Sequence, residues 1–96
     1  MESGNGAVTL RLYGALRQAA CDRDVTLTAG AKTVGDALAE FAALKGQRVA
    51  ELIFDRTGKV WGSLILLVND EPADLGEASP VSSGDVISIL MPLAGG

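Results

Sequence analysis

The sequence contains no histidine and a single cysteine, Cys21, and each shortage excludes a class of chemistry. Without histidine the chain lacks the commonest general base and the commonest nitrogen ligand for metals, so Ser-His-Asp and Cys-His catalysis cannot be built within it. One cysteine cannot form an internal disulfide or a thiolate metal site. We therefore expect neither of these two kinds of catalysis nor a thiolate metal site within the chain, with Cys21 as a structural or half-exposed thiol.

Long apolar runs are also missing. No run reaches the length of about 18 residues that a membrane-spanning helix needs, so no membrane segment is predicted. Residues 1–6 lack the basic and apolar regions of a signal peptide, which makes a cytoplasmic location the expectation. The 96 residues fit one domain, and an apolar content of 48% argues against disorder.

Positive charge is absent from the last third of the chain. No lysine or arginine follows Lys59, whereas this part contains five acidic residues: Asp70, Glu71, Asp74, Glu77 and Asp85. Nucleic acid is therefore not an expected partner, because binding to it needs a basic surface. Two interpretations of the acidic third stand side by side: a partner with a basic rim, and a contribution to solubility.

Two strands are predicted near the start of the chain. Apolar residues occupy every second position in residues 7–14 and again in residues 24–29, which is the period of a half-buried strand. Residues 15–23 between them are too many for a tight turn, so the sequence predicts a hairpin with a broad loop.

A helix is predicted over residues 33–45. Thr33 is a suitable N-cap residue, and Asp36 places a negative charge near the positive end of the helix. Apolar residues follow at helical spacing, and Gly46 is a suitable residue for the end of the helix.

The second half of the chain is less regular. Residues 47–63 are compatible with a short helical turn or a strand, followed by turn chemistry at 55–59. The continuous apolar run 64–68 predicts a well-buried strand, and residues 72–83 a loop with one short helical turn. Residues 86–91 predict the last strand.

The predicted order is β-β-α-β-β, an α+β domain with a mixed sheet of four to five strands and one main helix on one face. One helix covers only one face of such a sheet. Val86 and Leu90 fall on the uncovered face, either as part of a contact surface or as isolated exposed apolar residues.

The chain continues beyond this strand through five residues without charged side chains. Pro92 ends sheet pairing because it has no backbone N–H. Gly95 and Gly96 have no Cβ, so the backbone can enter a narrow channel in another protein. We expect a flexible arm at residues 1–6, a domain at 7–92 and a flexible tail at 93–96.

Several segments resemble the MoaD/ThiS family of ubiquitin-like sulfur carriers. The residues that carry the resemblance are Tyr13-Gly14-Ala15-Leu16-Arg17, Thr33-Val34-Gly35-Asp36-Ala37-Leu38, Val68-Asn69-Asp70-Glu71 and Gly84 through Gly96. The resemblance covers about residues 7–96. Residues 47–62 and the overall length are more similar to the molybdopterin-synthase small subunit or to cysteine-biosynthesis carriers than to the thiamine type.

The resemblance implies a ubiquitin-like β-grasp fold. It also implies that a ubiquitin-activating-type enzyme adenylates the carboxylate of Gly96 with ATP, after which the carboxylate becomes a thiocarboxylate that donates sulfur to a partner synthase. The chain itself would then be a carrier and not an enzyme, with no bound metal or cofactor. That synthase would serve cofactor, cysteine or natural-product biosynthesis. The expected tail and partner-binding residues are Gly95, Ala94, Leu93, Pro92, Met91 and Leu90. Two alternatives stay open: conjugation of Gly96 to lysines of target proteins, and a non-covalent ubiquitin-like interaction module.

Overall fold

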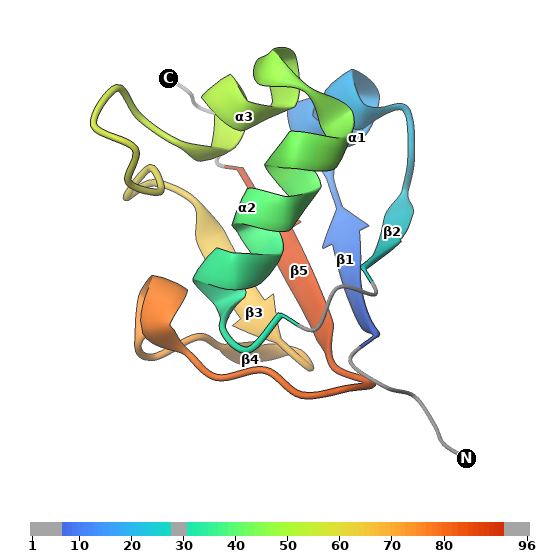
Figure 1. Ribbon diagram of the computed structural model, residues 1–96, viewed down its shortest axis with the longest axis vertical. Helices are drawn as coiled ribbons and strands as arrows, with labels where there is room; N and C mark the ends of the chain where they lie inside the picture. The colour runs from blue at the N-terminus through green and yellow to red at the C-terminus, as the bar shows by residue number, and fades with distance from the viewer. Residues whose placement is uncertain (1–6, 28–30, 92–96) are drawn as a thin grey trace.

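The computed structural model describes residues 7–27 and 31–91 (Figure 1). The elements in these ranges are strand β1 (Val8–Leu12), helix α1 (Gly14–Ala20), strand β2 (Asp24–Leu27), helices α2 (Val34–Lys45) and α3 (Gln47–Ile53), strands β3 (Ile65–Val68) and β4 (Glu71–Pro72), the 3₁₀ turn η1 (Gly76–Ala78) and strand β5 (Val86–Leu90). The predicted arm at 1–6 and tail at 93–96 lie outside the described residues. None of the described helices is both long and apolar enough to cross a bilayer.

The five described strands form one mixed sheet in the order β2-β1-β5-β3-β4. The first and last strands, β1 and β5, are parallel neighbours, and the other pairs are antiparallel. β5 therefore lies inside the sheet with a hydrogen-bonded strand on each side. The mixed sheet with helices against it confirms the predicted β-grasp architecture.

The helices pack on one face of the sheet, with α2 crossing it (Figure 1). The buried side chains of all three helices form a single cluster with alternate residues of β1 and β5. The largest members that are fully buried include Leu10, Leu16, Phe41, Ile53 and Ile89. The opposite face of the sheet carries no helix within the described part of the chain.

The helix predicted over residues 33–45 is confirmed as α2. The Asp36 N–H donates to Thr33 Oγ1 at 3.1 Å, and the Lys32 N–H donates to Asp36 Oδ2 at 3.2 Å. These bonds satisfy backbone donors that have no partner inside the helix. Gly46 ends the helix with φ +99°, a value that favours glycine.

The predicted broad loop at residues 15–23 is wrong, because this connection contains α1. Its two buried residues, Leu16 and Ala20, are four positions apart and face the core. The uncertain segment after Gly46 is also helical, and the buried pair Val49 and Ile53 of α3 has the same spacing. In both cases tertiary packing supports a helix of seven residues that is too short to be stable alone.

The apolar run at 64–68 does form a strand, β3, but the prediction that it is well buried is wrong. Ile65 is 49% exposed, and the other residues of the strand are half-buried. β3 lies between β5 and the two-residue edge strand β4, and no helix of residues 7–27 and 31–91 packs against one of its faces. A strand with one uncovered face normally alternates apolar and polar residues along its sequence. β3 has apolar side chains on both faces, so its sequence does not show this alternation.

Candidate functional site

The candidate site begins where the sheet ends, at Leu90 and Met91. The neighbouring residue Ile89 pairs with Leu12 of β1 on one side and with Leu66 of β3 on the other. β5 therefore holds Leu90 at a fixed position in the sheet. The remaining predicted site residues lie outside the described ranges: Pro92, Leu93, Ala94, Gly95 and Gly96.

Leu90 and Met91 have different surroundings. Met91 is half-buried and packs against the core cluster on the helix side. Leu90 is half-buried on the opposite side of the sheet, where it pairs with Ile65. Of these two predicted partner-binding residues, Leu90 belongs to the uncovered face and Met91 joins the tail to the core.

The uncovered face carries an apolar surface, which we call the open face. The strand registers place five apolar residues on it: Ile65, Leu67, Pro72, Val86 and Leu90. None of them belongs to the core cluster or to the half-buried residues that pack against it. Apolar side chains gathered on a face that no described helix covers make it a candidate for a contact with another molecule. The predicted position of Val86 and Leu90 on this face is confirmed.

Sequence reasoning missed the contribution of β3 and β4 to this face. Ile65 and Leu67 were hidden in a continuous apolar run, and Pro72 falls in a segment predicted as loop. The clue was the run of two turn-forming residues, Asn69-Asp70, which folds β4 back along β3. Both have positive φ, +53° and +69°, as a tight two-residue hairpin turn requires.

The acidic residues of the last third are not grouped around the start of the tail. Asp85 precedes β5, and the turn residue Asp70 and its neighbour Glu71 lie at that same end of the sheet, because Val68 pairs with Ile87. Leu90, which leads to the tail, is at the other end of β5.

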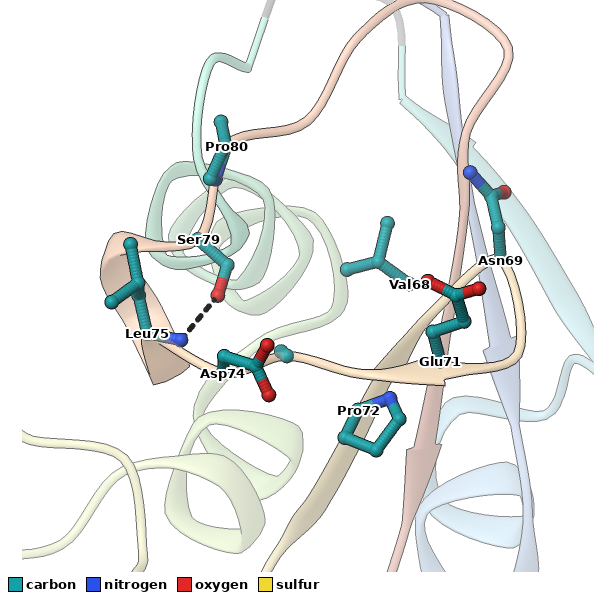
Figure 2. Close-up of a pocket in the computed structure, with 9 residues that line it drawn as sticks. Val68, Asn69, Glu71, Pro72, Asp74, Leu75, Ser79 and Pro80 are labelled. Carbon is teal, nitrogen blue, oxygen red and sulfur yellow. Dashed lines mark hydrogen bonds between the residues drawn. The ribbon is translucent and has the colours of Figure 1, made fainter.

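A hollow of about 500 Å³ lies beside β4 and η1 (Figure 2). Glu71 and Asp74 supply carboxylates to its lining, and the Ser79 hydroxyl accepts a hydrogen bond from the Leu75 N–H at 3.0 Å. Bound to that N–H, the Ser79 oxygen has a structural role in the turn.

Cys21 is exposed at the end of α1, with φ +61° and its thiol 3.6 Å from the Gln18 carbonyl oxygen. Among the described residues no group of three or more His, Cys, Asp or Glu side chains could hold a metal ion.

The turn at residues 55–59 has a perturbed carboxyl. Asp55 Oδ1 accepts hydrogen bonds from the Thr57 hydroxyl at 2.6 Å, the Thr57 N–H at 2.8 Å and the Lys59 N–H at 3.2 Å. The Thr57 hydroxyl bond is the main cause that lowers the pKa of Asp55. This turn precedes Trp61, whose indole N–H donates to the Glu51 carbonyl oxygen at 3.0 Å.

Comparison with known families and structures adds to this geometry. The model of the ThiS family matches residues 10–96. SAMP1 from Haloferax volcanii is 25% identical, with 95% of this chain and 100% of that chain covered and a TM-score of 0.85. A chain of the Amycolatopsis orientalis BexX/CysO complex is 26% identical, with 94% and 100% covered and a TM-score of 0.72. CysO from Mycobacterium tuberculosis is 24% identical, with 90% and 99% covered and a TM-score of 0.69. No protein of curated function matches in sequence.

Proposed function

The chain belongs to the ThiS family, and from this premise we propose that it is a sulfur carrier whose Gly96 carboxylate is activated by another protein. A partner enzyme of the ubiquitin-activating type adenylates Gly96, and a sulfur donor converts the adenylate to a thiocarboxylate. The thiocarboxylate then donates its sulfur to a partner synthase. The carrier is the substrate of the first enzyme and the sulfur source of the second.

The observation that carries this proposal is the extent of the family match. It reaches Gly96 and so includes Gly95 and Gly96 together with β5. β5 supports the same interpretation because both of its neighbours, β1 and β3, hold it in the sheet up to Leu90.

The chemistry needs little from the carrier. A carboxylate is a poor electrophile, whereas its acyl-adenylate carries AMP as a good leaving group. A sulfur nucleophile attacks the carbonyl carbon, a C–S bond forms, and the bond between carbon and the AMP oxygen breaks. The activating partner supplies ATP and the groups that stabilise the transition state. The carrier supplies the backbone of Gly95 and Gly96, which has no Cβ to obstruct a narrow channel.

The open face supports the requirement for partners. Ile65 is 49% exposed, and Leu67, Val86 and Leu90 are half-buried on a face that no described helix covers. A partner that packs an apolar surface against this face holds the domain in one orientation while it binds the tail. The activating enzyme and the synthase are the two proteins that need this orientation.

A second candidate, conjugation of Gly96 to lysines of target proteins, is favoured by one comparison. A solved structure named small archaeal modifier protein 1, from Haloferax volcanii, is 27% identical to this chain with a TM-score of 0.80. The same acyl-adenylate serves both functions, because a lysine amine and a sulfur donor attack the same carbonyl carbon. The two functions differ only in the nucleophile that the partner presents.

Adenylation is tested by ATP–pyrophosphate exchange with a ubiquitin-activating-type enzyme. We expect exchange that depends on the chain and disappears when Gly96 is deleted, while the deletion variant keeps the thermal unfolding curve of the wild type. Exchange that persists without Gly96 would contradict the proposal. Conjugates of higher mass in cell extract, absent with the Gly96 deletion, would select the modifier function.

A further inference from the structure

A basic pocket lies on the opposite flank of the open face from β4. Its volume is about 360 Å³, and its lining consists of Arg11, Leu12, Tyr13, Arg17, Arg23 and Asp24. Three guanidinium groups against one carboxylate give a formal excess of two positive charges. The chain as a whole has a net charge of −4, so this pocket has the opposite sign to the rest of the molecule.

Backbone hydrogen bonds hold the three arginines in fixed elements. The Leu12 N–H donates to the Arg23 carbonyl oxygen at 2.8 Å, which joins the end of β1 to the residue before β2. The Arg17 N–H donates to the Tyr13 carbonyl oxygen at 3.4 Å in the first turn of α1. All three arginine side chains are exposed, so their guanidinium groups are accessible to a partner.

One carboxylate already lies against these arginines. Arg11 Nε is 3.5 Å from Asp24 Oδ1 across the β1–β2 pair, with about half of each side chain exposed. This pair neutralises one guanidinium and leaves Arg17 and Arg23 without an assigned carboxylate among the described residues. The planar guanidinium group of arginine matches the two oxygens of a carboxylate.

The pocket is continuous with the open face. Arg11 pairs with Ser88 of β5, and Ser88 pairs with Leu67 of β3, so these three residues cross the sheet on one face. The pocket also lies at the tail end of the sheet, because Leu12 pairs with Ile89. A protein that binds the tail and packs on the open face therefore passes over Arg11, and from there it reaches the pocket that Arg17 of α1 and Arg23 also line.

We propose that this pocket is a docking site for carboxylate side chains of the activating enzyme that receives Gly96. The contact surface of that enzyme then has an apolar centre opposite Leu67 and Leu90, with aspartate or glutamate side chains opposite Arg17 and Arg23. This inference rests on the proposed function and adds the charge and the orientation of the partner. A partner with a basic rim would place positive charge against Arg17 and Arg23, so such a partner does not fit this side of the domain.

Replacing the arginines is expected to slow the association of the carrier with the activating enzyme and to leave the chemical step unchanged. Exposed charges at the rim of an interface mainly change the association rate and its dependence on salt. Loss of the arginines should therefore raise the KM for the carrier and leave kcat, measured with saturating carrier, close to the wild-type value.

The test is ATP–pyrophosphate exchange with an activating enzyme that is active on the wild-type chain. The variants are Arg17→Glu, Arg23→Glu and the double variant. Arg56→Glu is the matched control, because Arg56 is exposed on the 55–59 turn and does not line the pocket. The double variant should lower kcat/KM by about tenfold or more at about 50 mM salt, and by about threefold or less at about 500 mM. Equal thermal unfolding curves show that each variant folds.

The outcomes separate this inference from the proposed function. No exchange with the wild type, by an enzyme shown to be active on another carrier, overturns the proposed function. If the wild type supports exchange and the double variant has a kcat/KM no lower than that of Arg56→Glu, only the docking site is overturned. Inorganic phosphate serves as a small-anion probe in an NMR titration of the arginine Nε–H signals. If these NMR signals shift and saturate below about 1 mM phosphate, and the variants keep the wild-type KM, the docking site is also overturned. The pocket is then assigned to a small anion.

Discussion

Asn69 and Val86 are joined by two hydrogen bonds that fix the start of β5. The Val86 N–H donates to the Asn69 side-chain oxygen at 3.0 Å, and the Asn69 N–H donates to the Val86 carbonyl oxygen at 2.8 Å. The Asn69 side-chain amide also donates to Asp85 Oδ1 at 3.0 Å. One residue of the β3–β4 turn thus orients the strand that leads to the tail.

Replacing Asn69 by alanine should therefore destabilise the domain. The change removes two side-chain hydrogen bonds and places a residue with a Cβ at φ +53° without the local bonding of asparagine. We expect a loss of about 2–3 kcal/mol in the free energy of unfolding, measured by urea denaturation. Asn69→Gly keeps the favourable φ but loses the same bonds, and should be about 1 kcal/mol more stable than Asn69→Ala. Equal stability of the two variants would show that backbone strain plays no part.

Thr33→Ala should cost about 1 kcal/mol of unfolding free energy, because the Asp36 N–H loses its bond to Thr33 Oγ1. Thr33→Ser keeps this oxygen and should lie within about 0.5 kcal/mol of the wild type. Thermal or urea unfolding of the two variants measures the difference. A serine variant as unstable as the alanine variant would mean that the methyl group, and not the cap, is responsible.

The turn at 55–59 should weaken in acid. The hydrogen bonds from Thr57 and Lys59 lower the pKa of Asp55 below its ordinary value of about 3.8, so the ionised carboxyl is favoured in the folded state. A carboxyl with a lowered folded pKa contributes stability above its unfolded pKa and loses it as pH falls through the folded value. Amide exchange at Thr57 and Lys59 should therefore accelerate below about pH 3.8 beyond the intrinsic trend.

Asp55→Asn is the control for this turn. It removes the titration but keeps an oxygen for the same donors, so the extra acceleration at Thr57 should disappear. The same pH profile in Asp55→Asn as in the wild type would assign the effect to another group.

Ile65→Ser tests the open face. Ile65 is 49% exposed, so its replacement should change stability by about 1 kcal/mol or less, whereas KM for the carrier in pyrophosphate exchange should rise about tenfold. Leu44→Ser is the matched control, because Leu44 is 62% exposed on α2, on the helix side of the sheet. Equal KM values for the two variants would contradict a role of the open face in partner binding.

The sequence was sufficient for elements whose signals are local. Thr33, Asp36 and Gly46 determine the ends of α2 by hydrogen bonding and backbone conformation, and the predicted bounds agree with the structure. The alternation of Val8, Leu10 and Leu12 predicted both β1 and its buried face. These features depend on residues within a few positions of one another.

Features that depend on tertiary contacts were not predictable in the same way. α1 contains Gly14 at its start and buries only Leu16 and Ala20, too little for a clear helical period. The burial of β3 depends on its place beside a two-residue edge strand, which the run 64–68 does not encode. The basic pocket joins Arg11, Arg17 and Arg23 from three different segments, and only the folded chain brings them together.

The central claim is that Gly96 carries sulfur, and the intact mass of the chain after reaction tests it most directly. The chain is incubated with an activating enzyme, ATP and a sulfur donor, beside a variant with one alanine added after Gly96. The account predicts that the wild type gains the mass of one oxygen replaced by sulfur, located at Gly96 by fragmentation, and that the extended variant gains none. An unchanged wild-type mass, with an enzyme shown to be active on another carrier, would contradict the account.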